Sequence, residues 1–388
     1  MSRLEQLIAE FCPDGVEFQT LDHICVFETG TQLNKDKMLE TGLYPVMNGG
    51  ISPSGYWNEY NTEANTITIS QGGASAGYVN YITTRFWSGA HCYTAKLITD
   101  KVIYKFLYYF IKNNEYKLMN SKQGAGIPGL NKKSIYALKI PLPPLPIQQE
   151  IVRILDNFTE LTAELTAELT AELTARRKQY EYYRDLLLMF GEDIEILRLE
   201  EVADIYDSLH QTPTYVNEGF SMIRVTDVKG GYIDTTNTYK VDYETFLKFT
   251  QKYKPQYNDI VVSRVGSYGN FSLIGENEDC CLGQNTAIIH PRILNKYLYY
   301  YLCSNYVRTY IESNISGGSQ KTLSLKNIKN IPIAVPPIEE QERIVAILDR
   351  FDALCNDLTS GLPAEIEARQ KQYEYYRDKL LSFKELTA

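Results

Sequence analysis

The sequence has no run of about 18 consecutive apolar residues, the length that a membrane-spanning helix requires. Its seven cysteines show no Cys-x-x-Cys spacing and its histidines number only four, so we expect free thiols in a reducing cytoplasm. It contains neither an Asn-Pro-Pro-Tyr nor an Asp-Pro-Pro-Tyr motif for methylating adenine, and no Gly-x-x-x-x-Gly-Lys-Ser/Thr loop for nucleotide phosphates. We therefore expect no membrane contact, no metal site, no catalytic residues and no cofactor bound by this chain.

The net charge of −9 is unevenly distributed over the 388 residues. Residues 1–145 carry 13 basic and 12 acidic side chains, and residues 197–337 carry 14 of each. Residues 146–196 carry 5 basic and 11 acidic side chains, and residues 338–388 carry 7 and 11. The two large segments are therefore neutral, and a neutral domain can still present a basic face to nucleic acid.

The two acidic segments are copies of each other. Ile151–Asp156 recurs, with one substitution, at Ile344–Asp349, and Gln179–Asp185 recurs unchanged at Gln372–Asp378. Both pairs are offset by 193 residues (344 − 151 and 372 − 179). A two-fold internal repeat is typical of a protein built from two equivalent halves.

Long helices are predicted for both copies. No Gly or Pro occurs from Ile147 to Phe190, which gives about 44 residues, or roughly 66 Å of helix. Its centre is the fourfold repeat Glu-Leu-Thr-Ala over residues 160–175. The repeat places leucines four residues apart, in a ridge that we expect to be buried against a partner helix. The second copy, residues 338–383, is the expected partner, with a kink or break near Gly361 and Pro363. The ridge consists of Leu161, Leu165, Leu169 and Leu173.

The first domain (residues 18–143) and the second domain (residues 196–336) follow one mixed α/β plan. In each, a β-rich run leads into a Gly-rich loop, an aromatic helix follows, and a strand-like run comes last. The β-rich runs are Thr66–Ile69 and Asp259–Val262, the helices Tyr104–Ile111 and Lys296–Leu302, and the last runs Ile135–Pro141 and Ile328–Pro332. This shared plan predicts two copies of one domain.

The N-terminus matches the end of the first long helix. Residues 11–21 resemble residues 190–199 with one gap, and Leu7-Ile8 corresponds to Leu186-Leu187. Residues 1–17 should therefore complete the distal repeat, so that the domain order is circular and the two termini lie together.

With these motifs, and with Cys12–Glu17 near the N-terminus, the chain resembles the specificity subunit of a type I restriction-modification enzyme, of the kind with Thr-Ala-Glu-Leu repeats. The resemblance implies an α+β fold in which two target-recognition domains are separated by two long antiparallel helices, with a pseudo-two-fold arrangement. It implies that each domain reads half of a bipartite site in double-stranded DNA. Its expected partners are two methyltransferase subunits and restriction subunits, which would carry S-adenosylmethionine, ATP and Mg. The implied segments are 1–17, 18–143, 144–195, 196–336 and 337–388.

Gly-rich loops are the candidate DNA contacts. Glycine lets backbone N–H groups approach phosphate, while Gln, Arg and Asn make bidentate contacts with base edges. Ordinary hairpin turns are the alternative reading of the same loops. We expect Arg264 to contact guanine. The candidates are Gln71, Gly72, Gly73, Ser75, Tyr78, Lys122 and Gln123 in the first domain, and Arg264, Ser267, Tyr268, Asn270, Ser319, Gln320 and Lys321 in the second.

Three further features of the sequence have two readings each. Glu115 and Lys117 with Asp100 could hold a nuclease metal, but a polar helix end is the favoured reading. The repeated tyrosines at 180–183 and 373–376 favour helix packing or methyltransferase docking over base stacking. The alternative function is an acidic coiled-coil scaffold or DNA mimic.

Overall fold

The computed structural model describes residues 2–122, 129–276, 279–315, 321–356 and 361–386. The chain divides into two compact units. Unit 1 comprises Met1–Ala167 and Glu367–Ala388, and unit 2 comprises Glu168–Ile366. Each unit thus contains one mixed domain and parts of both repeated helical segments. Within the described ranges, no helix is long and apolar enough to cross a membrane.

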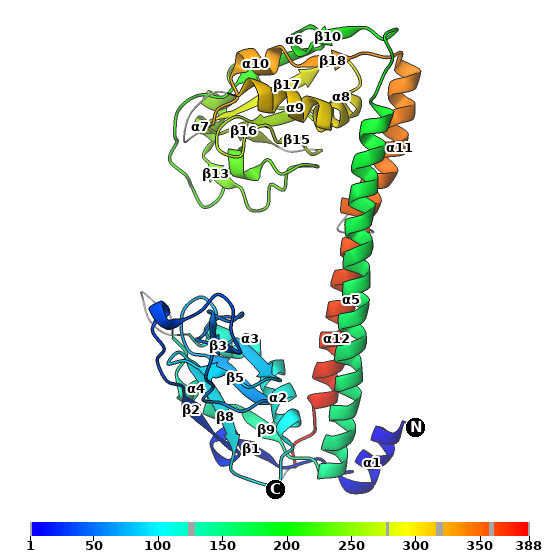
Figure 1. The fold of residues 1–388 in the computed structure, drawn as a ribbon. Helices are drawn as coiled ribbons and strands as arrows, with labels where there is room; N and C mark the ends of the chain where they lie inside the picture. Colours follow the sequence, from blue (N-terminus) through cyan, green and yellow to red (C-terminus); the bar gives the residue numbers. More distant parts are fainter. Residues whose placement is uncertain (1, 123–128, 277–278, 316–320, 357–360, 387–388) are drawn as a thin grey trace. The chain divides into compact units, whose positions relative to one another are not determined.

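The first domain is built from three sheets (Figure 1). A four-stranded antiparallel sheet has the order β2-β8-β5-β6, a three-stranded sheet has the order β4-β3-β7, and β1 pairs with β9. In the three-stranded sheet β3 and β7 run parallel. The strands are β1 (Phe18–Thr20), β2 (Cys25–Thr29), β3 (Tyr44–Met47), β4 (Tyr56–Trp57), β5 (Thr66–Ser70), β6 (Val79–Ile82), β7 (Trp87–Ser88), β8 (Cys92–Leu97) and β9 (Lys139–Pro141).

The second domain repeats this topology strand for strand. Its sheets have the orders β11-β17-β14-β15, β13-β12-β16 and β10-β18, and β12 again runs parallel to β16. The prediction of two copies of one domain is confirmed. The strands are β10 (Ile196–Arg198), β11 (Ala203–Asp207), β12 (Phe220–Ile223), β13 (Tyr239–Val241), β14 (Ile260–Ser263), β15 (Phe271–Leu273), β16 (Cys280–Leu282), β17 (Thr286–Pro291) and β18 (Pro332–Ala334).

The helices follow the predicted order, and the break near Gly361 and Pro363 separates α11 from α12. Pro337 lies just before α11 and Pro363 in the first turn of α12, where the missing N–H costs no helical hydrogen bond. The helices of unit 1 are α1 (Arg3–Phe11), α2 (Tyr104–Asn113), α3 (Glu115–Asn120) and α4 (Lys132–Tyr136). Those of unit 2 are α6 (Leu199–Val202), α7 (Tyr243–Thr250), α8 (Asn295–Leu302), α9 (Asn305–Asn314), α10 (Leu325–Lys329) and α11 (Ile338–Asn356). Both units receive residues from α5 (Leu145–Leu187) and α12 (Leu362–Leu381).

The predicted strand-like runs before the long helices are partly wrong. Each begins in the last two residues of a short helix, α4 or α10, and its strand starts only at Lys139 or Pro332. The reason is side-chain capping: Asn131 accepts a hydrogen bond from the N–H of Lys133, and Ser324 accepts one from Asn327. Such caps start a helix even where the following residues are β-branched.

An aspartate in each repeated segment anchors its mixed domain. In unit 1, Asp156 of α5 accepts hydrogen bonds from the Tyr109 hydroxyl at 2.6 Å and from Lys105 Nζ at 2.8 Å, both on α2. In unit 2, Asp349 of α11 accepts the same pair of bonds, at the same two distances, from two residues of α8. These are Tyr300 and Lys296. The anchor belongs to the repeat, and the domain supplies matching donors.

A buried glutamine repeats in the same way. Gln148 is 0% exposed, and its Oε1 accepts a bond from the N–H of Ile103 while its Nε2 donates to the carbonyl of Pro143. Gln341 is 3% exposed and makes the corresponding bonds with Leu294 and Pro336. Backbone partners of this kind do not constrain the sequence of the domain.

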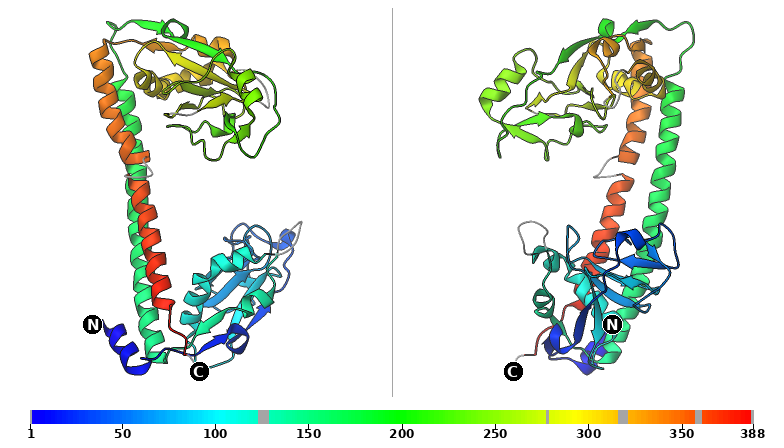
Figure 2. Two further views of the ribbon diagram at one scale, coloured as in Figure 1. Left: turned by 180° about the vertical axis from the view of Figure 1, so that it is seen from behind. Right: turned by 60° about the vertical axis from the view of Figure 1, so that its left-hand side comes forward.

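The repeated helices pack in opposite directions in unit 1 (Figure 2). Phe158 of α5 stacks on Tyr376 of α12, with ring centroids 5.9 Å apart, and Thr159 Oγ1 lies 3.0 Å from the Tyr373 hydroxyl. The number of the partner falls as the α5 number rises, so the helices are antiparallel. In unit 2 the equivalent rings, Phe351 and Tyr183, stack at 5.7 Å.

The expected burial of the leucine ridge is wrong. Leu161 is 61% exposed, and the other three leucines are only half-buried. Four residues turn a helix by about 400°, so a four-residue repeat drifts by roughly 40° per unit and cannot keep one face on a partner.

The expected meeting of the two chain ends is confirmed in unit 1. The N–H of Val16 donates to the carbonyl of Lys384 at 2.9 Å, and the N–H of Leu386 donates to that of Val16 at 3.0 Å. Gly15, with φ of +121°, allows this approach, because a Cβ there would lie 2.5 Å from the Lys384 carbonyl oxygen. Leu4 of α1 and Leu381 of α12 contribute to the same buried core.

Candidate nucleic-acid interface

The first Gly-rich loop of each domain is a hairpin connection. Residues 71–78 join the antiparallel strands β5 and β6, and residues 264–270 join β14 and β15. Both loops close through matching bonds: Gly77 N–H to Ser70 carbonyl and Gly269 N–H to Ser263 carbonyl, each at 2.8 Å. Both loops are therefore hairpin connections, as the alternative reading predicts. Their polar residues lie at one end of the four-stranded sheet.

In each unit a later segment, residues 129–130 or 322–323, pairs with the first Gly-rich loop. Leu130 N–H donates to the Gln71 carbonyl at 2.7 Å, and Leu323 N–H donates to the Arg264 carbonyl at 2.8 Å. Sequence reasoning did not pair these segments, which are far apart in the chain. Gln123, Ser319 and Gln320, three of the predicted contacts, lie outside the described residues.

Gln71 and Arg264 occupy equivalent positions but have different surroundings. The Arg264 guanidinium forms an ion pair with Asp207 through Nη1, and Nε donates to the Leu323 carbonyl at 3.3 Å. The Arg264 side chain is only 12% exposed. Arg264 thus links its own Gly-rich loop to Asp207 and to the segment at Leu323. A direct guanine contact would require the ion pair with Asp207 to open.

The other loop residues differ in exposure. Ser267 and Asn270 are exposed, and Gly72, Gly73, Ser75 and Tyr268 are half-buried. Lys122 Nζ donates to the Ala74 carbonyl at 2.7 Å, so it is bound to the first Gly-rich loop, whereas Lys321 is exposed. The side chains that face solvent here are therefore mostly short and polar.

Tyr78 has a structural role. Lys112 Nζ lies 4.3 Å from the centroid of its ring and also bonds to Glu115 at 2.6 Å. Burial is the main cause that raises the pKa of Tyr78. Glu115 also accepts the N–H of Val79 at 2.7 Å, so this carboxylate, a possible metal ligand by its sequence, holds α3 to β6. Within the described ranges, no cluster of three His, Cys, Asp or Glu residues could hold a metal ion.

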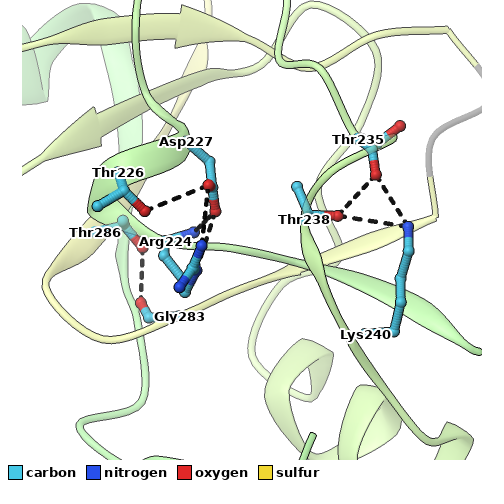
Figure 3. A network of polar contacts seen from close by, with 8 residues as sticks. All are labelled: Arg224, Thr226, Asp227, Thr235, Thr238, Lys240, Gly283 and Thr286. Atoms are coloured by element: carbon cyan, nitrogen blue, oxygen red, sulfur yellow. Dashed lines mark hydrogen bonds and ion pairs between the residues drawn. The ribbon is translucent and has the colours of Figure 1, made fainter. Parts of the chain in front are cut away.

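The same end of the sheets carries two more loops that the sequence reading missed. In the first domain, Asn48 follows β3 and Gly89–His91 join β7 to β8. In the second, Arg224 follows β12, and the turn from Gly283 leads into β17 (Figure 3). The Asn-Gly-Gly run at residues 48–50 could have indicated the first of these loops, because such a run marks a tight turn after a strand.

The repeated tyrosines lie on the long helices α5 and α12. Tyr182 is 64% exposed and Tyr375 is 62% exposed, and each packs edge-on against the next tyrosine at 5.4 Å. The adjacent Asp185 and Asp378 hold the mixed domains through Asn305 and Asn113. One repeat thus combines an internal anchor with an exposed aromatic side chain.

Comparisons with known proteins agree with this architecture. The family described as type I restriction modification DNA specificity domain matches residues 13–175 and 191–368. A type I restriction enzyme specificity subunit of Haemophilus influenzae is 34% identical over 95% of this chain and 96% of its own length. The EcoR124I/EcoR124II specificity subunit of Escherichia coli is 34% identical over 99% of this chain and 97% of its own length.

A solved structure supports the fold. It concerns complex assembly and conformational transition of the type I restriction-modification system. One of its chains aligns with a TM-score of 0.62 at 18% identity, covering 95% of this chain and 98% of that chain. Together the matches favour DNA recognition over the acidic scaffold. The duplicated domain, the repeated helical segments and these matches show that the chain belongs to the family of type I restriction-modification specificity subunits, which are non-catalytic DNA-recognition components.

Proposed function

We propose that each domain of this chain reads one half of a bipartite site in double-stranded DNA, and that the helices set the distance between the halves. Two methyltransferase subunits dock on the repeated helical segments, and restriction subunits join that assembly. The partner subunits carry S-adenosylmethionine, ATP and Mg, and this chain binds none of them. The complex acts in the cytoplasm, on the DNA of its host.

One observation carries the proposal: the two frameworks are equal and the side chains at their loop ends differ. The strand orders match throughout, whereas Asn48 follows β3 where the second domain has Arg224 after β12. Equal frameworks give equal docking, and different side chains give different base preferences.

The repeated exposed tyrosines support two equal docking surfaces. Tyr182 and Tyr375 are 193 residues apart and almost equally exposed. Exposed aromatic side chains are enriched where proteins bind each other. Replacing Tyr375 with Ala should therefore reduce the number of bound methyltransferase subunits from two to one, as measured by native mass spectrometry. Tyr116→Ala, at an exposed site outside the repeats, should keep both subunits.

A domain exchange tests the reading of half-sites. Residues 18–143 are replaced by those of another family member, and the methylated adenines of the host genome are mapped by sequencing. We expect one half-site to change while the other half-site and the spacer stay the same. A simultaneous change in both half-sites would contradict the proposal.

A further inference from the structure

Asn48 and Arg224 occupy equivalent positions in the two domains. Each is the first residue after the central strand of the three-stranded sheet, β3 or β12. The preceding residues, Met47 and Ile223, accept hydrogen bonds from the N–H groups of Gly89 at 2.9 Å and Gly283 at 2.7 Å. The backbone around the two positions is therefore the same.

In each domain a glycine makes room for the side chain at this position. A Cβ on Gly89 would lie 2.3 Å from Asn48 Oδ1, and a Cβ on Gly283 would lie 3.2 Å from Arg224 Cγ. The amide of Asn48 and the aliphatic part of the Arg224 side chain therefore lie against the turn that contains the glycine. This turn limits the directions in which the two polar ends can point.

The two positions belong to the same end of the sheets as the Gly-rich hairpins. The N–H of Gln71 donates to the His91 carbonyl, and the N–H of Arg264 donates to the Asn285 carbonyl, both at 2.9 Å. His91 and Asn285 each close the turn that begins at the glycine beside Asn48 or Arg224. Each domain therefore brings two strand-end loops together in one polar rim.

Arg224 is held in a fixed orientation (Figure 3). Its guanidinium lies 3.7 Å from the centroid of the Tyr239 ring, and Nε and Nη2 each lie 3.4 Å from a carboxylate oxygen of Asp227. Asp227 also accepts the backbone N–H of Arg224 at 2.8 Å. The carboxylate contacts use Nε and Nη2, so they do not engage Nη1. Lys240, the other cation in this view, instead donates to three oxygen atoms of its own domain.

Asn48 is held on one side only. Its Oδ1 accepts the N–H of His91 at 3.3 Å, and among the described residues no bond from Nδ2 is found. An asparagine amide can pair with both N6 and N7 of adenine, and an arginine can pair with both O6 and N7 of guanine. Planar groups that are already oriented lose less entropy when they make such contacts.

We propose that Asn48 and Arg224 are equivalent base-reading residues, so that the half-site of the first domain contains an adenine at the contacted base pair and that of the second contains a guanine. This inference rests on the proposed function and adds the residues and the base at each half-site. Arg264, which pairs with Asp207 and with the Leu323 carbonyl, then has a structural role.

The test uses the complete restriction-modification complex and maps methylated motifs by sequencing. With Arg224→Ala, discrimination at one G·C pair of the second half-site should fall by about 5- to 150-fold, the range for one bidentate contact. The matched control is Arg292→Ala. Arg292 also pairs with an aspartate, Asp204, but it follows β17 at the opposite end of the four-stranded sheet. This control should keep the motif.

The same design applies to Asn48→Ala, which should relax one A·T pair of the first half-site. Asn58→Ala is its control, because Asn58 follows β4, which pairs antiparallel with β3 and so ends at the far side of that sheet. An unchanged motif, a relaxed pair of the other composition, or relaxation in the wrong half-site would each overturn the inference.

A second substitution, and the motif of the wild-type complex, complete the test. If Arg224→Ala does not assemble, Arg224→Lys keeps the stem and the charge but offers only one point of contact, and it should lose part of the discrimination at the same base pair. An unchanged motif for a folded Arg224→Lys would overturn the inference as well. A wild-type complex that methylates no bipartite motif would instead contradict the proposed function itself.

Discussion

Tyr300 donates a hydrogen bond to Asp349 over 2.6 Å and thereby joins the mixed domain of unit 2 to the repeated helix α11. Replacing Tyr300 with Phe keeps the ring and removes the hydroxyl. A hydrogen bond to a charged group contributes about 1.5–3 kcal/mol, so the free energy of unfolding of unit 2 should fall by about that amount. Hydrogen exchange of α8 amides measures the change.

Tyr109→Phe is the matched change in unit 1, where Tyr109 bonds to Asp156 over the same distance. It should raise the exchange rates of α2 and leave those of α8 unchanged. Equal effects of either substitution on both helices would show that the anchors are not local.

Alkaline pH should destabilise the first domain through Tyr104. The hydroxyl of Tyr104 donates to the Ala95 carbonyl at 2.7 Å, and burial raises its pKa to about 12. The ordinary pKa of tyrosine is about 10, so the folded state favours the protonated form. This contribution to stability is fully present below about pH 10 and is lost as the pH rises towards 12. Urea denaturation at a series of pH values should show the free energy of unfolding falling in this window, and Tyr104→Phe should make the loss less steep.

Arg264→Ala should destabilise unit 2 without changing the DNA motif. The substitution removes the ion pair with Asp207 and the bond to the Leu323 carbonyl, so we expect a loss of about 1.5–3 kcal/mol in the free energy of unfolding. Urea denaturation and methylation mapping measure the two effects. Arg308→Ala, which breaks an exposed pair with Glu312, should cost less than about 1 kcal/mol. A changed motif at unchanged stability would return Arg264 to the base-reading role that its loop first suggested.

Much of the framework could be predicted because it depends on local signals. The long helix needed only the absence of Gly and Pro, and the break at Gly361 needed only their presence. The strands β5 and β14 were visible as β-branched runs before glycine. Signals of this kind act within a few residues.

The candidate site depends on contacts between distant residues, and these were not visible. Asp207 and Arg264 are 57 residues apart, and nothing in either segment marks them as a pair. The same holds for Arg224, which became a candidate only when β12 and β16 placed it beside Gly283. The predicted burial of the leucine ridge was wrong for another reason. Its regular spacing was taken to indicate burial, although a four-residue spacing turns the ridge away from a fixed partner.

The tetrapeptide repeats should set the spacer between half-sites. Deleting Thr166–Leu169 removes one unit, which is roughly 6 Å of helix and about 40° of net rotation. One base pair contributes about 3.4 Å and about 34–36°, so the rotations nearly match. A helix inclined to the DNA axis would project a shorter length. We expect the non-specific spacer to shorten by one base pair while both half-sites stay the same.

Methylation mapping of the deletion variant decides this prediction. A two-residue deletion is the control, because it turns the following helix by about 200° and should disrupt folding or assembly. An unaltered spacer, or an altered half-site, after the four-residue deletion would show that the repeats do not measure the distance.

The anchors formed by Asp156 and Asp349 have a genetic consequence. Each holds its domain through a lysine and a tyrosine on one helix, while the buried glutamines bind only backbone atoms. A foreign domain needs only a few side chains to be accepted: those two donors and the asparagine that bonds to Asp185 or Asp378. Recombination can therefore exchange a whole recognition domain in one event. Point mutations can alter the loops of that domain without weakening the hydrogen bonds that hold it to the helices. Assembly and specificity can evolve separately in this chain.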